Sequence, residues 1–184
     1  MTDEVDPTDD WFPLAELGER LAGLVWVERR IGELLDAWSR IESHAGASIA
    51  FAGAAAHHYW HAEILEDCLP TSDALRETTR PRPPTQGWDD AISLLGALTE
   101  PDRTAARVAA VVREAYPWLL RETTALLEFC RPIADAHVMR WLRFIEIDHH
   151  DDSVALAELL AAVQSNAVDL ADRSVLAQID LRSR

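Results

Sequence analysis

Three histidines lie within five residues of one predicted helix, in the stretch His57-His58-Tyr59-Trp60-His61. His58 and His61 are three residues apart, so their side chains share one face of a helix. His57 and His61 are four apart and would share a face after a modest rotation of the same helix, which keeps His57 as an alternative to His58. Imidazole is a common metal ligand and titrates near neutral pH. The cluster therefore predicts metal or proton chemistry.

A second motif, Glu146-x-x-His149, places a carboxylate and an imidazole one helical turn apart on one face. Both residues fall inside a mostly apolar series with spacings of three and four, which predicts that they point into the protein. The competing interpretation is a buried Glu–His hydrogen bond or a solvated acidic face. The series consists of Met139, Leu142, Glu146, His149, Ser153, Leu156, Leu160 and Val163.

Glu28 is the third candidate, because it occupies an apolar position in the middle of the first predicted helix. A lone carboxylate there costs several kcal/mol unless it is paired or bound to a metal. The alternatives are an ion pair with a core-facing arginine, or a rotation that moves Glu28 to the edge of the core. The apolar series around it consists of Leu14, Leu17, Leu21, Leu24, Ile31 and Leu35.

The positions of the predicted turns indicate which candidates face one another. Counting outward from the turn near residue 44, Glu28 faces the histidine cluster. Counting outward from the turn near residue 131, Glu114 faces Glu146 and His149. Glu122 follows a cleaner apolar series but lies about two turns from that level, so we prefer Glu114 to Glu122. The predicted metal ligands are Glu28, His58, His61, Glu114, Glu146 and His149.

Four long helices must position these residues, because apolar residues recur at helical spacings and alternating β-branched runs are missing. We predict the helices over residues 13–43, 45–69, 100–130 and 132–164, with Pro117 bending the third. Short turns join the first helix to the second and the third to the fourth, so each of these pairs is antiparallel.

The second and third helices are joined by a long crossover, residues 70–101. Its segment Arg80-Pro81-Arg82-Pro83-Pro84 cannot be helical, because successive prolines lack N–H donors and clash with the preceding turn. A short helix over 88–98 is expected within the crossover. We thus predict an all-α four-helix bundle over residues 13–166, preceded by an acidic segment (1–12) and followed by a helical or flexible tail (167–184).

Composition narrows the function classes. The 184 residues suit one domain, and 32 acidic against 17 basic side chains give a net charge of −15, which disfavours nucleic acid as a partner. Every basic residue is arginine, so Schiff-base chemistry and a P-loop lysine are excluded. The chain has no signal-like start and no apolar run near the roughly 20 residues that span a bilayer, so we expect a cytoplasmic protein without membrane association. Cys68 and Cys130 are expected to be free buried thiols.

With these residues and this order of helices, the chain resembles the ferritin-like diiron-carboxylate superfamily over roughly residues 13–164. In that superfamily each of two hairpins provides Glu and then Glu-x-x-His. The second hairpin here matches with Glu114 and Glu146-x-x-His149, whereas the first departs because His58 precedes His61. The stretch 57–63 followed by Leu69-Pro70 is also similar to uncharacterised actinobacterial ferritin-like proteins.

The resemblance implies an iron centre of one or two ions, with manganese or zinc as alternatives, that activates O2 to oxidise or hydroxylate a small molecule. A neutral imidazole in place of a bridging carboxylate makes a mononuclear or asymmetric site an alternative to a full dinuclear centre. The competing function is a catalytically silent bundle that serves as a binding or protein-interaction module, with its polar core residues in a closed hydrogen-bond network.

Additional apolar strips on two of the predicted helices are wider than one bundle core requires. Large apolar patches rich in tryptophan are typical of interfaces, so the strips predict a homodimer. The crossover or the tail could instead cover them within one chain. The strips consist of Val25, Trp26, Ile31, Leu34 and Trp38 on the first helix and Trp141, Phe144 and Ile145 on the fourth.

Overall fold

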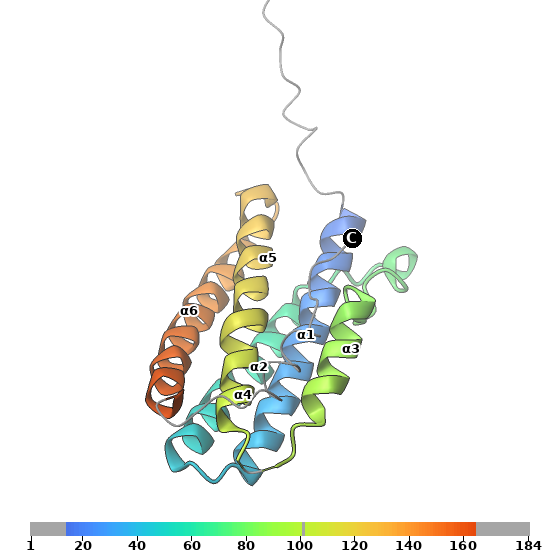
Figure 1. Ribbon diagram of the computed structural model, residues 1–184. Coiled ribbons are helices and arrows are strands. Elements are labelled where there is room, and N and C mark those ends of the chain that lie inside the picture. Colours follow the sequence, from blue (N-terminus) through green and yellow to red (C-terminus); the bar gives the residue numbers. More distant parts are fainter. Residues whose placement is uncertain (1–13, 101, 165–184) are drawn as a thin grey trace, which may run out of the picture.

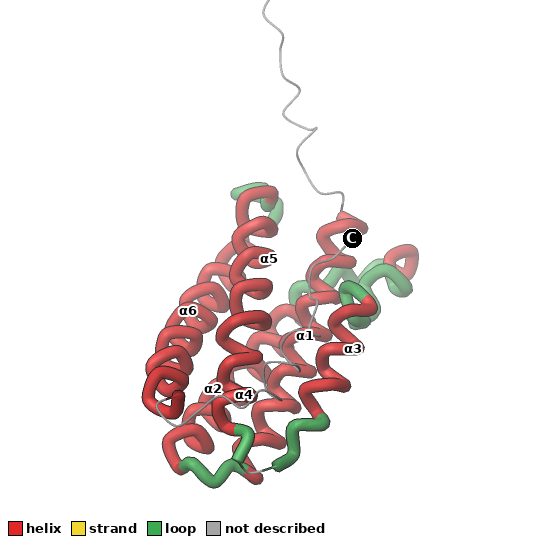
Figure 2. The backbone as a smooth tube through the Cα atoms, in the orientation of Figure 1, coloured by secondary structure: helices red, strands yellow, loops and turns green. Residues whose placement is uncertain are grey.

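The computed structural model describes residues 14–100 and 102–164, and this part of the chain is helical with no strand (Figures 1 and 2). The all-α prediction is thereby confirmed for the described residues, while the predicted segments 1–12 and 167–184 lie outside them. The elements are α1 (Leu14–Ile41), α2 (Ala45–Asp67), the 3-10 turn η1 (Asp73–Leu75), α3 (Gln86–Gly96), α4 (Thr104–Ala110), the π-helical segment η2 (Val111–Ala115), α5 (Tyr116–Phe129) and α6 (Ala136–Gln164).

Two helical hairpins form the body of the molecule. The helices α1 and α2 pack along each other, α5 packs on α6, and α6 also contacts α2 and α4 (Figure 1). In Figure 1 the run from α4 through α5 forms one long column beside α6. The order of two hairpins with a long connection agrees with the predicted bundle, and its assignment to the ferritin-like fold stays a prediction. No helix among the described residues is both long enough and apolar enough to cross a bilayer.

The crossover lies along α1, and two glycines of α1 allow the close approach. A Cβ atom on Gly18 would lie 2.9 Å from Thr79 Cγ2, and one on Gly23 would lie 3.3 Å from Pro84 Cβ. Its helix α3 then packs on α1 with the buried side chains of Trp88, Ala91, Ile92 and Leu95. The crossover therefore covers apolar surface of α1 within the same chain.

This covering changes the interpretation of the apolar strips. Val25, Ile31, Leu34, Trp38 and Ile145 are buried in the core, and Trp26 and Trp141 are partly buried against it. Phe144 is exposed. The strip on the first helix is thus internal, and only the part on the fourth helix reaches the surface. The thiols of Cys68 and Cys130 are buried and free, as predicted.

A buried arginine links the end of the crossover to α1 through an ion pair and hydrogen bonds. The side chain of Arg107 is fully buried, and its Nη1 lies 2.9 Å from Oε2 of Glu42, whose side chain is equally buried. Its Nε and Nη2 donate to the carbonyl of Leu98 at 3.0 and 2.9 Å, and Nη2 also donates to the carbonyl of Glu100 at 2.5 Å. One guanidinium therefore joins the end of α1, the end of the crossover and the start of α4.

The helix predicted over 100–130 is interrupted before Pro117, where five residues adopt the π-helical geometry of η2. Pro117 has no N–H to donate to the preceding turn, and its ring would clash with the carbonyl four residues earlier. The wider π turn accommodates this conflict. It also introduces an extra residue into the helix, which rotates the register by about 100° relative to an uninterrupted α-helix.

Candidate metal centre

Four of the six predicted ligands come together in the core: Glu28 from α1, His58 and His61 from α2, and His149 from α6. Each is fully buried, and one ligand atom from each lies within 4.8 Å of all the others. Three separate helices therefore contribute donors to one compact group, which could hold a metal ion.

The carboxylate of Glu28 is the centre of this group. Its Oε2 lies 2.5 Å from Nδ1 of His58 and 3.4 Å from Nδ1 of His61, and its Oε1 lies 2.8 Å from Nε2 of His149. The donor set is thus three imidazole nitrogens around one carboxylate.

Several of these atoms have no hydrogen-bond partner among the described residues. They are Oε1 of Glu28, Nδ1 of His61 and both ring nitrogens of His149; the short separation between Glu28 and His149 does not have hydrogen-bond geometry. Buried polar atoms in folded proteins are almost always paired. Within the group, His58 Nδ1 and Glu28 Oε2 form a hydrogen bond of 2.5 Å, and the unpaired atoms of the other residues face one another, so the group could hold a metal ion.

Two of the histidines are oriented through their outer nitrogens. Nε2 of His61 lies 3.1 Å from Oδ2 of Asp148, and Nε2 of His58 lies 3.3 Å from the hydroxyl of Tyr116. That hydroxyl in turn donates to Oδ2 of Asp152 at 3.4 Å. Metal-binding histidines typically give their second N–H to such a partner, which fixes the ring and the tautomer. The arrangement leaves Nδ1 of both rings directed at Glu28.

The sequence analysis missed Tyr116, Asp148 and Asp152 as parts of the site. Asp148 and Asp152 lie four residues apart in the acidic run of α6, and their spacing could have indicated that both share one face with the histidines. The placement of Tyr116 depends on η2, and the only sequence signal for that segment was Pro117.

Glu114 and Glu146 lie outside the group. Glu114 is half-buried and lines a small space between η2, α1 and α3, because η2 turns it away from α6. Glu146 is half-buried and accepts a hydrogen bond from Oγ1 of Thr124 at 2.8 Å. The buried face of α6 includes Met139, Leu142, His149, Leu156 and Leu160, as the predicted series requires, but Ile145 is buried beside them in place of Glu146.

The two alternatives left open by the sequence also have defined positions. Glu122 pairs with Arg20 at 3.2 Å, away from the histidines. His57 is exposed and its Nδ1 lies 2.9 Å from Oδ2 of Asp152, so His58 rather than His57 joins the group.

Electrostatics favours the protonation states that a metal requires at Glu28 and His58, whereas at His61 it favours the proton that a metal would have to displace. Burial opposes charge on Glu28, but the nearby rings of His149 and His58 outweigh it and hold the pKa of the carboxyl well below its usual value. Burial lowers the pKa of His58 despite the attraction of Glu28. For His61, burial acts in the same direction, but its contacts with Glu28 and Asp148 raise the pKa above the usual value. Metals bind ionised carboxylates and neutral imidazoles.

The low pKa of Glu28 makes acid destabilise the metal-free protein. A group whose pKa is depressed by folding contributes stability above its unfolded pKa, and this contribution is lost as the pH falls through the folded pKa. We expect the difference in free energy of unfolding between wild type and Glu28→Gln to shrink as the pH falls from 4.5. Urea denaturation of both metal-free proteins at a series of pH values measures this difference. A difference that does not change with pH would contradict the lowered pKa of Glu28.

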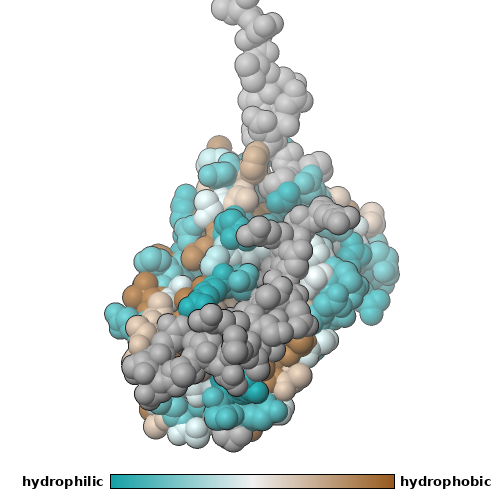
Figure 3. Space-filling view, in the orientation of Figure 1, coloured by the Kyte–Doolittle hydropathy of each residue, from teal (hydrophilic) through white to brown (hydrophobic). Residues whose placement is uncertain are grey.

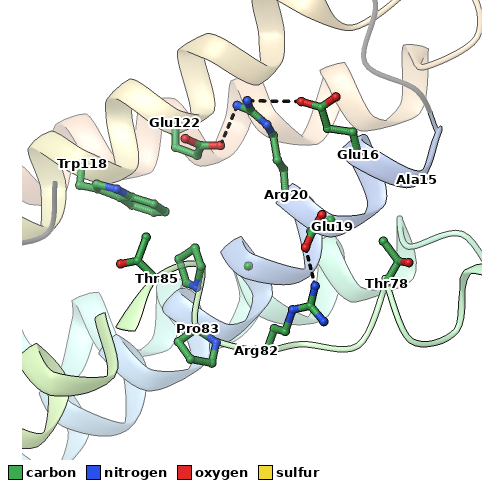
Figure 4. A pocket seen from close by; sticks show the side chains of 12 residues that line it. Ala15, Glu16, Glu19, Arg20, Thr78, Arg82, Pro83, Thr85, Trp118 and Glu122 are labelled. Atoms are coloured by element: carbon green, nitrogen blue, oxygen red, sulfur yellow. Dashed lines mark hydrogen bonds and ion pairs between the residues drawn. The ribbon is translucent and has the colours of Figure 1, made fainter. Parts of the chain in front are cut away.

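A separate cavity of about 680 Å³ lies at the N-terminal end of α1 (Figure 4). Its charged residues are paired: Arg20 with Glu122 at 3.2 Å and with Glu16 at 3.6 Å, and Arg82 with Glu19. None of the four grouped residues lines this cavity. The residues of α1 that line it are on the opposite side of that helix from Glu28. This cavity is therefore separate from the metal group.

Comparison of the chain with protein-family models, with curated proteins and with solved structures finds no match.

Proposed function

We propose that this chain is a non-haem metal protein in which Glu28, His58, His61 and His149 hold one ion, with iron as the metal and O2 as the oxidant. The reaction class is oxidation or hydroxylation of a small molecule. The observation that supports the proposal is the convergence of unpaired, fully buried donor atoms from three helices.

The donor set favours one ion over two. Glu114 and Glu146, which would complete a dinuclear carboxylate site, lie outside the group. Three imidazoles and one carboxylate suit iron, manganese or zinc. Zinc in structural sites is satisfied by four protein ligands, whereas iron in oxygenases keeps positions open for O2. Bound iron would relay electrons to O2; the substrate would supply them in an oxidation, and the substrate together with an external two-electron reductant would supply them in a hydroxylation.

The surrounding residues have definable tasks. With a metal bound, Asp148 would accept the Nε2 proton of His61 and the Tyr116 hydroxyl would accept that of His58. Both Nδ1 atoms would then be free to bind the metal, and that of His58 would give up its hydrogen bond to Glu28. Burial and the carboxylate of Asp152 raise the pKa of Tyr116 well above its usual value, so its hydroxyl stays protonated and donates to Asp152. The complete burial of the four ligands excludes water, which strengthens electrostatic interactions within the site.

Metal analysis tests the proposal. We expect protein purified after expression with iron and manganese to contain about one ion per chain, because the four donors form a single group. Glu28→Gln and His149→Ala should lose most of it. Glu114→Gln and Glu146→Gln are matched controls, because these carboxylates lie outside the group, and both should retain the metal. A small fraction of one ion in the wild type, unchanged in all four variants, would refute the site.

A second candidate function is a catalytically silent bundle that binds its partner elsewhere on the surface, in a version where a closed metal site replaces the closed hydrogen-bond network considered from the sequence. The complete burial of all four donors favours it. Oxygen uptake by the iron-loaded protein in the presence of a chemical reductant distinguishes the two. Uptake that is lost in His149→Ala supports the oxygen-activating function, whereas metal binding without uptake supports the silent bundle.

A further inference from the structure

The solvent-facing side of α6 carries three large apolar residues along one line, with His150 and Asp151 between the second and the third. Phe144, Ile147 and Val154 are 45, 56 and 46 % exposed, although all three are large apolar residues. They lie opposite the buried face of the same helix, which includes Ile145 and His149. In Figure 3 apolar residues appear among polar ones along the edge of the molecule that α6 forms in Figure 1. An apolar line of this kind on a helix is typical of an interface.

Charges flank this line in a self-complementary order. Arg143 lies four residues before Ile147 and Asp151 lies four residues after it, and both side chains are exposed. Neither makes an ion pair within the described residues. The positive charge is thus on the N-terminal side of Ile147 and the negative charge on the C-terminal side, on one helical face.

We propose that this face, defined by Arg143, Phe144, Ile147, His150, Asp151 and Val154 and called the α6 stripe, binds a second copy of the chain. The two α6 helices pack antiparallel about a two-fold axis through Ile147. A two-fold axis makes each contact occur twice with exchanged partners. Helical geometry then places every residue a given number of positions before 147 opposite the residue the same number after 147.

This arrangement brings unlike charges together and pairs the central apolar residue, Ile147, with its own copy. Arg143 faces Asp151 of the partner subunit, Phe144 faces His150 of the partner subunit, and the two Ile147 side chains meet at the axis. A parallel arrangement would instead place arginine against arginine and aspartate against aspartate, which is unfavourable. The charge order therefore selects the antiparallel pair and selects a copy of the same chain as the partner.

Aromatic residues beside the stripe extend its apolar area. The ring of Trp141 lies 6.0 Å from that of Phe144 and 6.3 Å from that of Trp60, which is 42 % exposed. Exposed tryptophans are enriched at interfaces. The net charge of −15 per chain opposes association, but it is screened at physiological salt, where the Debye length is about 8 Å.

Light scattering coupled to size exclusion at physiological salt tests the proposal. We expect twice the chain mass of 20.6 kDa at micromolar concentration. Arg143→Glu and Asp151→Arg should each raise the dimer dissociation constant at least about tenfold, because each places like charges opposite each other twice. The double variant Arg143→Glu/Asp151→Arg should restore the dimer. Arg121→Glu, on the exposed surface of α5, makes the same charge change and should leave the mass unchanged.

Because every substituted residue is exposed, we expect each variant to keep the helical content of the wild type, and circular dichroism checks this. A wild-type mass of one chain at all concentrations would overturn the proposal. A dimer that survives both single variants would show that a different surface is used. Single variants that dissociate without rescue in the double variant would overturn the antiparallel pairing. The proposal is independent of the metal, since His149 lies on the opposite side of α6.

Discussion

Arg107→Ala is expected to lower the free energy of unfolding by about 3–5 kcal/mol, the range typical for breaking a buried ion pair from one side. The substitution leaves the fully buried carboxylate of Glu42 without its cation. It also removes the donors that satisfy the carbonyls of Leu98 and Glu100. Urea denaturation followed by circular dichroism measures the change.

A matched control is Arg82→Ala, which removes an exposed ion pair with Glu19 and should change stability by less than about 1 kcal/mol. Adding Glu42→Gln to Arg107→Ala should recover part of the loss, because it removes the uncompensated charge. An Arg107→Ala variant as stable as Arg82→Ala would show that the buried pair does not hold the crossover.

Chelation should lower the melting temperature of the iron-loaded protein by about 8–16 °C. A ligand present at about 1,000 times its dissociation constant stabilises the folded state by about 4.1 kcal/mol. For a chain of this length each kcal/mol corresponds to about 2–4 °C. Differential scanning calorimetry before and after treatment with a chelator and desalting gives the shift, and adding iron back should reverse it.

The control for chelation is His149→Ala, which lacks one of the four donors and should melt at the same temperature with and without chelator. Glu146→Gln, whose carboxylate lies outside the group, should show the full wild-type shift. An equal shift in His149→Ala would assign the bound metal to another place in the chain.

Helix bounds and the first hairpin of the site could be predicted from the sequence because they depend on local signals. The buried apolar residues of α1 continue at helical spacing on both sides of Glu28, so the inward direction of the Glu28 side chain followed from spacing. The short turn between α1 and α2 fixed the level at which Glu28 meets His58 and His61. In this hairpin, helical periodicity and chain length were sufficient.

The second hairpin depends on tertiary packing that spacing does not encode. Both Ile145 and Glu146 fit an inward position on α6, and the core selected the apolar side chain, because burying Glu146 without a partner would be costly. On the facing helix, the prediction assumed regular α geometry through residue 114. The π segment invalidates that assumption, so Tyr116 lies beside His58 and Glu114 does not reach His149.

The position of Tyr116 in the site also depends on the number of residues in the π segment. A π turn is equivalent to an α-helix that has accepted a one-residue insertion, and its extra residue is taken up within a single turn. Removing one residue between 111 and 115 would return the helix to regular geometry and rotate one side relative to the other by about 100°. Arg107, which precedes the segment, would keep its partners, whereas Tyr116 would turn away from His58. Over these five residues the number of residues, more than their identity, therefore determines whether the tyrosine reaches the histidine.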